Sequence, residues 1–276
     1  MVTLNKRNLP LELGIILLAA IGIFLAAGTL FNGIGLRLDI HQRLQPSSPE
    51  HVFGTDALGR DIFSCLTFGT AISLAIALSA VFISATIGAL LGFAAGWYGG
   101  LLSSCIMRCA DLILSFPGIL LTLAIVAFWG PGIFNLVLAL VFSGWVTYAR
   151  LVRAEVLKTK NKEFILAAKG FNASALHIAV NHMVPLIFPL LLTQAVLGIA
   201  GVILLESSLN FLGLGLDPRL PTLGQMIDAG RGHIFVRPAL VFLPGGCLVV
   251  LITAFLLLAD GIKNPSLQSG FANESK

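Results

Sequence analysis

The sequence predicts an all-α, polytopic membrane protein whose six transmembrane helices form a bundle. Of its 276 residues, 57% are hydrophobic and 11% are charged, which is more apolar than a soluble domain of this length requires. Six separate runs approach or exceed the roughly 20 apolar residues that a helix needs to cross a bilayer. These runs are continuously apolar rather than alternating, so a transmembrane β-barrel is excluded.

The first of the six expected spans covers residues 11–31 and follows Lys6 and Arg7. It is long enough to cross a membrane, and a cleaved signal peptide is the alternative. The other five expected spans cover residues 71–95, 112–128, 133–149, 184–205 and 239–259.

The second expected span carries Gly88, Gly92 and Gly96 on one helical face. Small residues at this spacing let two helix backbones approach closely within a bilayer. We expect this face to pack inside the bundle, and the alternative is contact with a second copy of the chain.

The third expected span contains a charged pair and a proline. Arg108 and Asp111 lie three residues apart and therefore on one helical face. A carboxylate in a membrane segment is costly without a partner, so we expect Arg108 to pair with it; a proton relay is the alternative. Pro117 cannot donate a helical hydrogen bond, so it should kink this span.

The distribution of Lys and Arg predicts the orientation of the chain. With a cytoplasmic N-terminus, eleven of the seventeen cations lie inside and six outside, and an even number of spans returns the C-terminus to the cytoplasm. The two longer connections expected outside cover residues 32–64 and 210–238. The expected outside cations are Arg37, Arg43, Arg60, Arg219, Arg231 and Arg237. The expected inside cations are Lys6, Arg7, Arg108, Lys263, Lys276 and the six between residues 150 and 169.

Residues 150–182 form a polar island between two apolar runs. Helix-forming residues continue from 151 to 170, and residues 172–174 can cap a second helix that leads toward His182. Pro185 then falls in the first turn of the fifth span, where its missing N–H costs least. A thin helix with charged edges suits a groove on another protein, whereas a loop lying on anionic lipid is the alternative. The cations of the island are Arg150, Arg153, Lys158, Lys160, Lys162 and Lys169.

The stretch from Glu163 to Ser174, with His182 and Pro185 after it, resembles the EAA loop of bacterial ABC importer permeases. In that loop a Glu and an aromatic residue precede two alanines and a basic residue, and a Gly follows three positions later. Leu166 stands where the family often has Glu, and Asn172 stands where it usually has Gly. Asn adopts a left-handed backbone more readily than most residues, so we expect the turn to be kept.

Further motifs resemble the second, C-type permease subunit of dipeptide, oligopeptide and nickel importers, in the same order and over nearly the whole chain. They are Gly-Thr-Asp-Ala-Leu-Gly-Arg-Asp at 54–61, the pair of Arg108 and Asp111, Gly-Pro-Gly at 130–132, Tyr-Ala-Arg-Leu-Val-Arg at 148–153 and Phe-Leu-Gly-Leu-Gly at 211–215. Leu223 stands where the family often has Trp, and the usual Leu-Asp-Pro ending is absent from the sequence.

The resemblance implies a type I ABC importer permease in the bacterial cytoplasmic membrane. It implies an N-terminal helix and external segment over residues 1–70 and a permease domain over 71–265, with a coupling loop at about 150–183. The implied partners are a second homologous permease subunit, two ATP-binding ABC subunits and an external substrate-binding protein, with no nucleic acid. The resemblance also implies which residues contact the ATPase, namely Glu163, Ala167, Ala168, Lys169, Gly170 and Asn172.

The sequence contains no phosphate-binding loop of the Gly-x-x-x-x-Gly-Lys-Ser/Thr type. We therefore expect a subunit without catalytic residues or a bound cofactor, with ATP and Mg²⁺ used by the partner ATPases. We expect no metal site either, because His41, His51 and His233 are scattered and the four cysteines lack ligand spacing.

The candidates for the translocation path are Glu206, Ser207, Ser208 and Asn210, at the outer end of the fifth span. A carboxylate there could meet a peptide amine or a metal-bearing solute, and an interfacial Glu that reaches water is the alternative. Nickel or a nickel chelate is the expected substrate, with di- and oligopeptides as the close second, because these importers share all the permease motifs.

Two other functional classes are weighed against the importer. A stand-alone ion-coupled secondary carrier would need several buried ionisable residues and an inverted repeat, whereas charge in the spans is nearly limited to Asp111, Glu206 and Asp260. A membrane anchor for a peripheral enzyme would explain the basic island but not the motifs in the two external connections.

Overall fold

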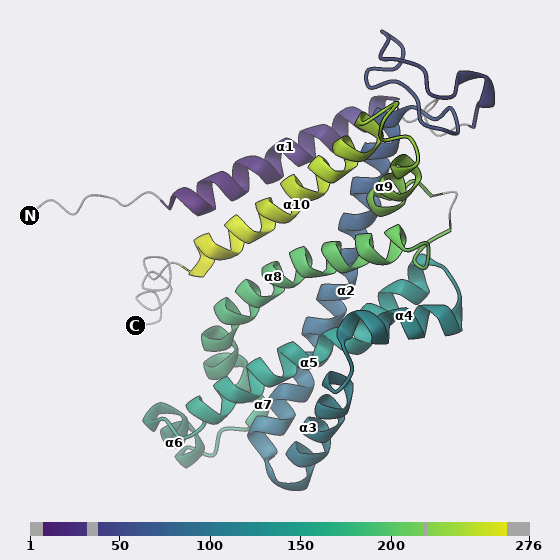
Figure 1. Ribbon diagram of the computed structural model, residues 1–276. Helices are drawn as coiled ribbons and strands as arrows, with labels where there is room; N and C mark the ends of the chain where they lie inside the picture. The colour runs from purple at the N-terminus through teal and green to yellow at the C-terminus, as the bar shows by residue number, and fades with distance from the viewer. Residues whose placement is uncertain (1–7, 32–37, 218–219, 264–276) are drawn as a thin grey trace, which may run out of the picture.

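The described residues fold into an all-α bundle with short helical elements at its two ends (Figure 1). The structure is a computed structural model that describes residues 8–31, 38–217 and 220–263. Five cations used to predict the orientation, Lys6, Arg7, Arg37, Arg219 and Lys276, lie outside these residues. The elements are α1 (Leu9–Phe31), η1 (Ile40–Gln42), α2 (Ile62–Tyr98), α3 (Gly100–Leu114), α4 (Gly118–Trp129), α5 (Ile133–Thr159), α6 (Glu163–Gly170), α7 (Ala175–Ile178), η2 (Ala179–Met183), α8 (Val184–Phe211), α9 (Leu223–Arg231) and α10 (Ala239–Lys263).

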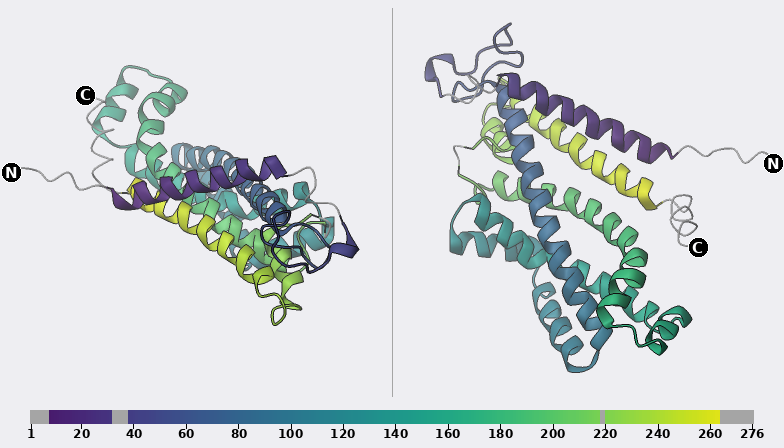
Figure 2. Two further views of the ribbon diagram at one scale, coloured as in Figure 1. Left: turned by 90° about the horizontal axis from the view of Figure 1, so that it is seen from above. Right: turned by 180° about the vertical axis from the view of Figure 1, so that it is seen from behind.

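Five stretches of the described chain are each helical, long and apolar enough to cross a membrane, and α3 and α4 make a sixth when the bent pair is counted as one span. The bundle expected from the sequence is thus matched by five single helices and one bent pair. α1 and α10 lie side by side in every view (Figures 1 and 2). Gly14 lies against the backbone of Leu258, and Gly261 lies against Leu11. The start of α1 therefore meets the end of α10 at one end of the bundle.

The glycine face of α2 packs inside the bundle, as expected. A Cβ atom added to Gly92 would lie 2.4 Å from the carbonyl oxygen of Ala149 in α5, and Gly88 and Gly96 meet the same helix. Such distances are too short for any side chain, so glycine at these positions sets the close approach of α2 and α5.

The third span is broken rather than merely kinked. α3 and α4 meet at 86°, with residues 115–117 between them. Pro117 precedes α4, where it cannot donate a helical hydrogen bond and disfavours helical geometry at the residue before it. The 12 residues of α4 extend about 18 Å, well short of the roughly 30 Å hydrocarbon core. The prediction of one continuous span over residues 112–128 is therefore wrong, because the bend lies inside that range and α4 alone is too short.

Several helices extend past the apolar runs that predicted them. α5 continues ten residues beyond the predicted end at residue 149 and takes the first third of the polar island with it. Its buried Val152 and Val156 explain this extension, because they keep packing after the sequence turns polar. The single helix expected over 151–170 is wrong, since the chain leaves helical geometry at 160–162.

Candidate functional site

α6 lies at the end of the bundle opposite α9 and the segment 38–61 (Figure 1). The short connection from α5 is held by two hydrogen bonds. The backbone N–H of Lys162 donates to the carbonyl of Thr159 at 2.9 Å. The Nζ atom of Lys160 donates to the carbonyl of Gly96 in α2 at 3.1 Å. Lys160 therefore fixes the end of α5 against α2, a structural role that its position in a basic run did not reveal.

The inner face of α6 is anchored by one large side chain. Ile165 is fully buried in a cluster with Val152 and Val156 of α5, Met183 of η2 and Ile187 of α8. Ala168 is half-buried and packs on the same cluster. Burying an isoleucine side chain contributes about 1.5–3 kcal/mol, so α6 is held firmly although it has only eight residues.

The outer face of α6 is exposed and carries both small and large side chains. Glu163, Ala167 and Gly170 are exposed, and Leu166, which replaces the family's Glu, is 51% exposed. The two alanines, both implied by the resemblance to contact the ATPase, point differently, because Ala168 faces inward while Ala167 faces outward. The side chain of Lys169 lies outside the described part of the structure.

The turn after α6 adopts the geometry predicted for it. Asn172 has a φ of 60°, the left-handed conformation for which the family uses Gly. The backbone N–H of Ala173 donates to the carbonyl of Ala168 at 3.1 Å and closes the turn. The Oγ atom of Ser174 then accepts a hydrogen bond from the backbone N–H of His177 at 3.2 Å, so Ser174 caps α7.

His182 joins α6 to the start of the next span. Its ring lies 6.4 Å from the ring of Phe164 in α6 and 6.0 Å from that of His177 in α7. His182 lies in η2, a π-helical turn, and Pro185 follows in the first turn of α8, as predicted. The sequence offered only the spacing of this His and Pro as a signal, and the structure gives the His a packing role.

Asp111 pairs with a different arginine from the one expected. The Oδ1 atom of Asp111 in α3 accepts a hydrogen bond from Arg150 in α5 at 2.6 Å, with both side chains about half exposed. Arg108, the predicted partner, is exposed. The spacing places Arg108 and Asp111 on one helical face, but the partner of the carboxylate comes from the neighbouring helix α5. Nearby, Arg153 Nε donates to Ser103 Oγ at 3.0 Å and adds a second tie between these helices.

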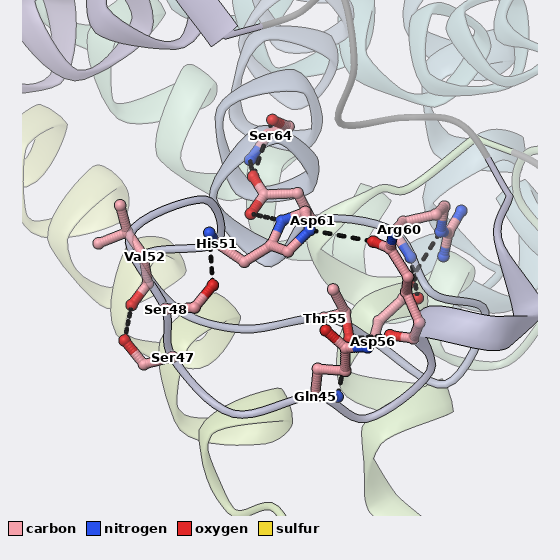
Figure 3. Close-up of polar contacts among 11 residues, drawn as sticks. Gln45, Ser47, Ser48, His51, Val52, Thr55, Asp56, Arg60, Asp61 and Ser64 are labelled. Atoms are coloured by element: carbon pink, nitrogen blue, oxygen red, sulfur yellow. Dashed lines mark hydrogen bonds and ion pairs between the residues drawn. The ribbon is translucent and has the colours of Figure 1, made fainter.

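At the other end of the bundle, the Gly-Thr-Asp-Ala-Leu-Gly-Arg-Asp motif folds around Asp56 (Figure 3). Its carboxylate accepts from the backbone N–H groups of Leu58 and Arg60 at 2.8 and 2.9 Å and from Arg60 Nε at 2.7 Å. Gly54 and Gly59 have φ values of 78° and 76°, and a Cβ on Gly59 would overlap the carbonyl of Asp39. The motif therefore encodes a compact turn.

Asp61 joins this turn to α2. Its Oδ2 atom accepts from the backbone N–H and the hydroxyl of Ser64, each at 2.8 Å, and so caps the helix. Its Oδ1 atom lies 3.1 Å from Nδ1 of His51 (Figure 3). The other ring nitrogen of His51 lies 3.2 Å from Oε1 of Gln42. His51, which we took for a scattered surface histidine, is thus largely enclosed and orders the segment.

The two connections expected outside contact each other. Arg237, at the entrance to α10, donates from Nη2 to the carbonyl of Leu44 at 2.8 Å. Gly69 of α2 packs against the carbonyl of Pro221, before α9. Residues far apart in sequence therefore form one surface at this end of the bundle.

The candidates for the translocation path point into the chain. Glu206, Ser207 and Asn210 are buried, and Ser208 is half-buried. The Glu206 carboxylate accepts hydrogen bonds from Ser73 of α2 at 2.9 Å, from Ser207 at 3.2 Å and from the amide of Asn210. The alternative of an interfacial Glu that reaches water is wrong, because Glu206 is 0% exposed. The cluster binds α2 to α8.

The family model for the inner membrane component of binding-protein-dependent transport systems matches residues 88–267. The chain is 35% identical to the dipeptide transport system permease protein DppC of Alkalihalophilus pseudofirmus, over 95% of this chain and 86% of that protein. It is 34% identical to the nickel transport system permease protein NikC of Escherichia coli K12, over 82% of each chain. It is 40% identical to the glutathione transport system permease protein GsiD of Shigella dysenteriae, over 79% of this chain and 72% of that protein.

A solved structure shares the fold at low sequence identity. An inward-facing MetNI methionine ABC transporter matches with a TM-score of 0.58 and 18% identity, over 72% of this chain and 94% of the matched chain. The family match, the relatives and the fold agree. The chain belongs to the inner membrane components of binding-protein-dependent transport systems and is a C-type permease subunit of an ABC importer.

Proposed function

We propose that this permease subunit imports short peptides, and that α6 is the segment through which a partner ATPase drives it. The observation that carries the proposed role of α6 is its two-sided character. Its inner side chain, Ile165, is buried among side chains of α5, α7, η2 and α8, while Glu163, Leu166 and Ala167 form an exposed face. A helix whose exposed face carries apolar side chains beside a charge suits a groove on another protein.

The anchoring of α6 makes it able to transmit force. Ile165 and His182 bind it to η2 and α8, and the connection at Lys160 binds it to α2 and α5. A displacement of α6 therefore moves several spanning helices together. When ATP closes a pair of ATPase subunits, the bundle shifts between conformations as a rigid body, and the differential affinity of the nucleotide for the two states supplies the bias.

The proposed assembly contains a second homologous permease, two ATPase subunits and an external binding protein that delivers the substrate. ATP and Mg²⁺ bind to the ATPase subunits in this assembly. The end of the bundle that holds α6 faces the cytoplasm, together with both termini, and the joined surface around Leu44 and Arg237 receives the binding protein. The excess of Lys and Arg near α6 supports this orientation.

The relatives support a peptide as the substrate class. Two of the three relatives described above are permeases for dipeptides and for glutathione, which is itself a peptide, and the third is a nickel permease. Nickel, which the sequence favoured, is the second candidate. Measuring which of the two ligands the cognate binding protein binds, by calorimetry with a dipeptide and with Ni²⁺, discriminates between them.

Ala167→Asp tests the docking surface. This change places a carboxylate on the exposed face of α6 beside Glu163 and should lower coupled uptake at least ten-fold, because the ATPase would have to bury an unpaired charge. Uptake is measured in proteoliposomes that contain the complete transporter, and retention of the ATPase on the membranes is measured by sedimentation. Ala168→Asp is a poorer test, since Ala168 packs inward.

Lys158→Ala is the matched control. Lys158 is an exposed cation in the last turn of α5, and it serves only the orientation of the chain in this proposal. Its removal should leave uptake unchanged. Wild-type uptake by Ala167→Asp, or an equal loss with Lys158→Ala, contradicts the docking surface. Uptake by this chain without any ATPase subunit would instead support a secondary carrier.

A further inference from the structure

A mostly apolar cavity of about 250 Å³, with a few neutral polar groups in its wall, lies between α2, α5, α8 and the bend that joins α3 to α4. It is separate from the Glu206 cluster, and no role assigned above uses it. Its walls come from three helices of the bundle, with the residues Phe116 and Gly118 at the bend forming the remaining side.

The cavity exists because few side chains extend into this space. The 86° turn at Pro117 directs α4 away from the axis of α3, so neither helix fills the space at the corner. A Cβ atom added to Gly118 or to Gly201 would meet no atom within 4 Å. Gly201 lies on α8, so two sides of the cavity are lined by glycines that face open space.

The lining carries neutral hydrogen-bonding groups. Thr147 and Tyr148 of α5 and Gln194 of α8 present a hydroxyl, a phenol and a carboxamide. Within the described part of the chain, these three side chains make no hydrogen bond to another protein group. Thr147 is exposed and Gln194 half-buried, so their polar atoms are available to a molecule in the cavity, whereas Tyr148 is buried in the wall with its hydroxyl against Gly198.

These side chains are unsuited to contact with lipid. An amide or hydroxyl moved from water into hydrocarbon without a partner costs several kcal/mol, on the order of 4–8 by transfer to cyclohexane. Polar residues within spanning segments therefore face the interior of an assembly or a water-filled space. Glu206 and Asn210 differ in this respect, because they already satisfy each other and are closed off from the surface.

We infer that the cavity lined by Thr147, Tyr148 and Gln194 is this subunit's wall of the translocation path, and that it takes solutes bearing amide groups. The inference rests on the proposed function and gives it a site and a substrate class. Hydroxyl, phenol and carboxamide groups can donate to and accept from the C=O and N–H groups of a peptide. None of the described lining residues is charged, and none is a His or Cys that would coordinate bare Ni²⁺.

Access by water is the first test. Thr147→Cys and Gln194→Cys are made in a chain whose four native cysteines are replaced by alanine, and the complete transporter is reconstituted. The anionic thiol reagent 2-sulfonatoethyl methanethiosulfonate should modify both at least ten times faster than Ser79→Cys, because thiolates form only where water reaches them. Ser79 lies on an exposed face of α2 outside the cavity. Equal rates at all three positions overturn the inference.

Filling the cavity is the second test. Gly201→Leu inserts a side chain into the open space and should lower uptake of the dipeptide Ala-Ala at least ten-fold, while the complex assembles and hydrolyses ATP. Gly246→Leu is the matched control, because Gly246 of α10 is also exposed, faces open space and lies outside the cavity. Undiminished uptake by Gly201→Leu overturns the role in transport even where the thiols react rapidly.

The failure of the proposed function gives a different result. A wild-type complex that takes up Ni²⁺ but not Ala-Ala contradicts both the peptide assignment and the amide-bearing class, while the two thiol rates still decide whether the cavity lines a path.

With a functional peptide importer, Gln194→Leu should lower Ala-Ala uptake at least five-fold by removing the carboxamide. Unchanged uptake by that variant overturns the amide recognition alone.

Discussion

A single asparagine sets the path of the chain after the proposed coupling helix. Asn172 has a φ of 60°, a conformation that costs roughly 1–2 kcal/mol for most residues and less for Asn. Because this turn connects α6 to α7 and hence to the start of α8, its geometry determines how α6 is presented. The local conformation was predictable because few residue types tolerate it.

Asn172→Val should disrupt the turn, since a β-branched side chain is strongly disfavoured at positive φ. We expect the ATPase activity stimulated by the binding protein to fall at least three-fold, while the thermal stability of the bundle changes little. Asn172→Gly is the control and should retain full stimulation, because Gly adopts the conformation without cost. A fully active Asn172→Val variant would show that the turn geometry is dispensable.

Between elements, the ion pair of Asp111 and Arg150 ties α3 to α5. Because both side chains are about half exposed, the pair should contribute no more than about 1 kcal/mol to the free energy of unfolding. A double-mutant cycle of Asp111→Ala and Arg150→Ala, followed by thermal unfolding in detergent, should give a favourable coupling of that size. The matched cycle with Arg108→Ala should give none, and a larger coupling to Arg108 would restore the partner expected from sequence.

Disturbing the contact of α2 with α5 should lower the stability of the bundle more than breaking the ion pair of Asp111 and Arg150. Gly92→Leu would push a side chain into the backbone of Ala149, so the helices must separate. Overpacking of this kind typically costs about 1–3 kcal/mol, and we expect a lower unfolding temperature and reduced recovery of the assembled transporter. Gly22→Leu, on an exposed face of α1 with open space around it, should be neutral. Equal stability of the two variants would contradict the packing role of Gly92.

Over the whole molecule, the features predicted from sequence are those encoded locally. The long apolar helices, the inward glycine face of α2 and the positive φ of Asn172 each follow from residue type and spacing. The partner of Asp111 did not, because it depends on how α5 approaches α3. The burial of Glu206 depends likewise on Ser73, which lies 133 positions away in the chain. The cavity beside Thr147 and Gln194 was not predictable either, because it depends on the direction of the bend between α3 and α4 and on how the surrounding helices pack.

The length of α5 has a mechanical consequence. Its 27 residues extend roughly 40 Å from the α4 end of the bundle to α6, and its second half meets Gly88, Gly92 and Gly96 of α2 in turn. A helix held at three successive points along a neighbour moves together with that neighbour. The distance between spin labels at the exposed positions Phe134 of α5 and Phe82 of α2 should therefore stay constant when ATP binds, while both labels shift against a label on α10. A change in the distance between Phe134 and Phe82 would mean that α5 moves independently of α2.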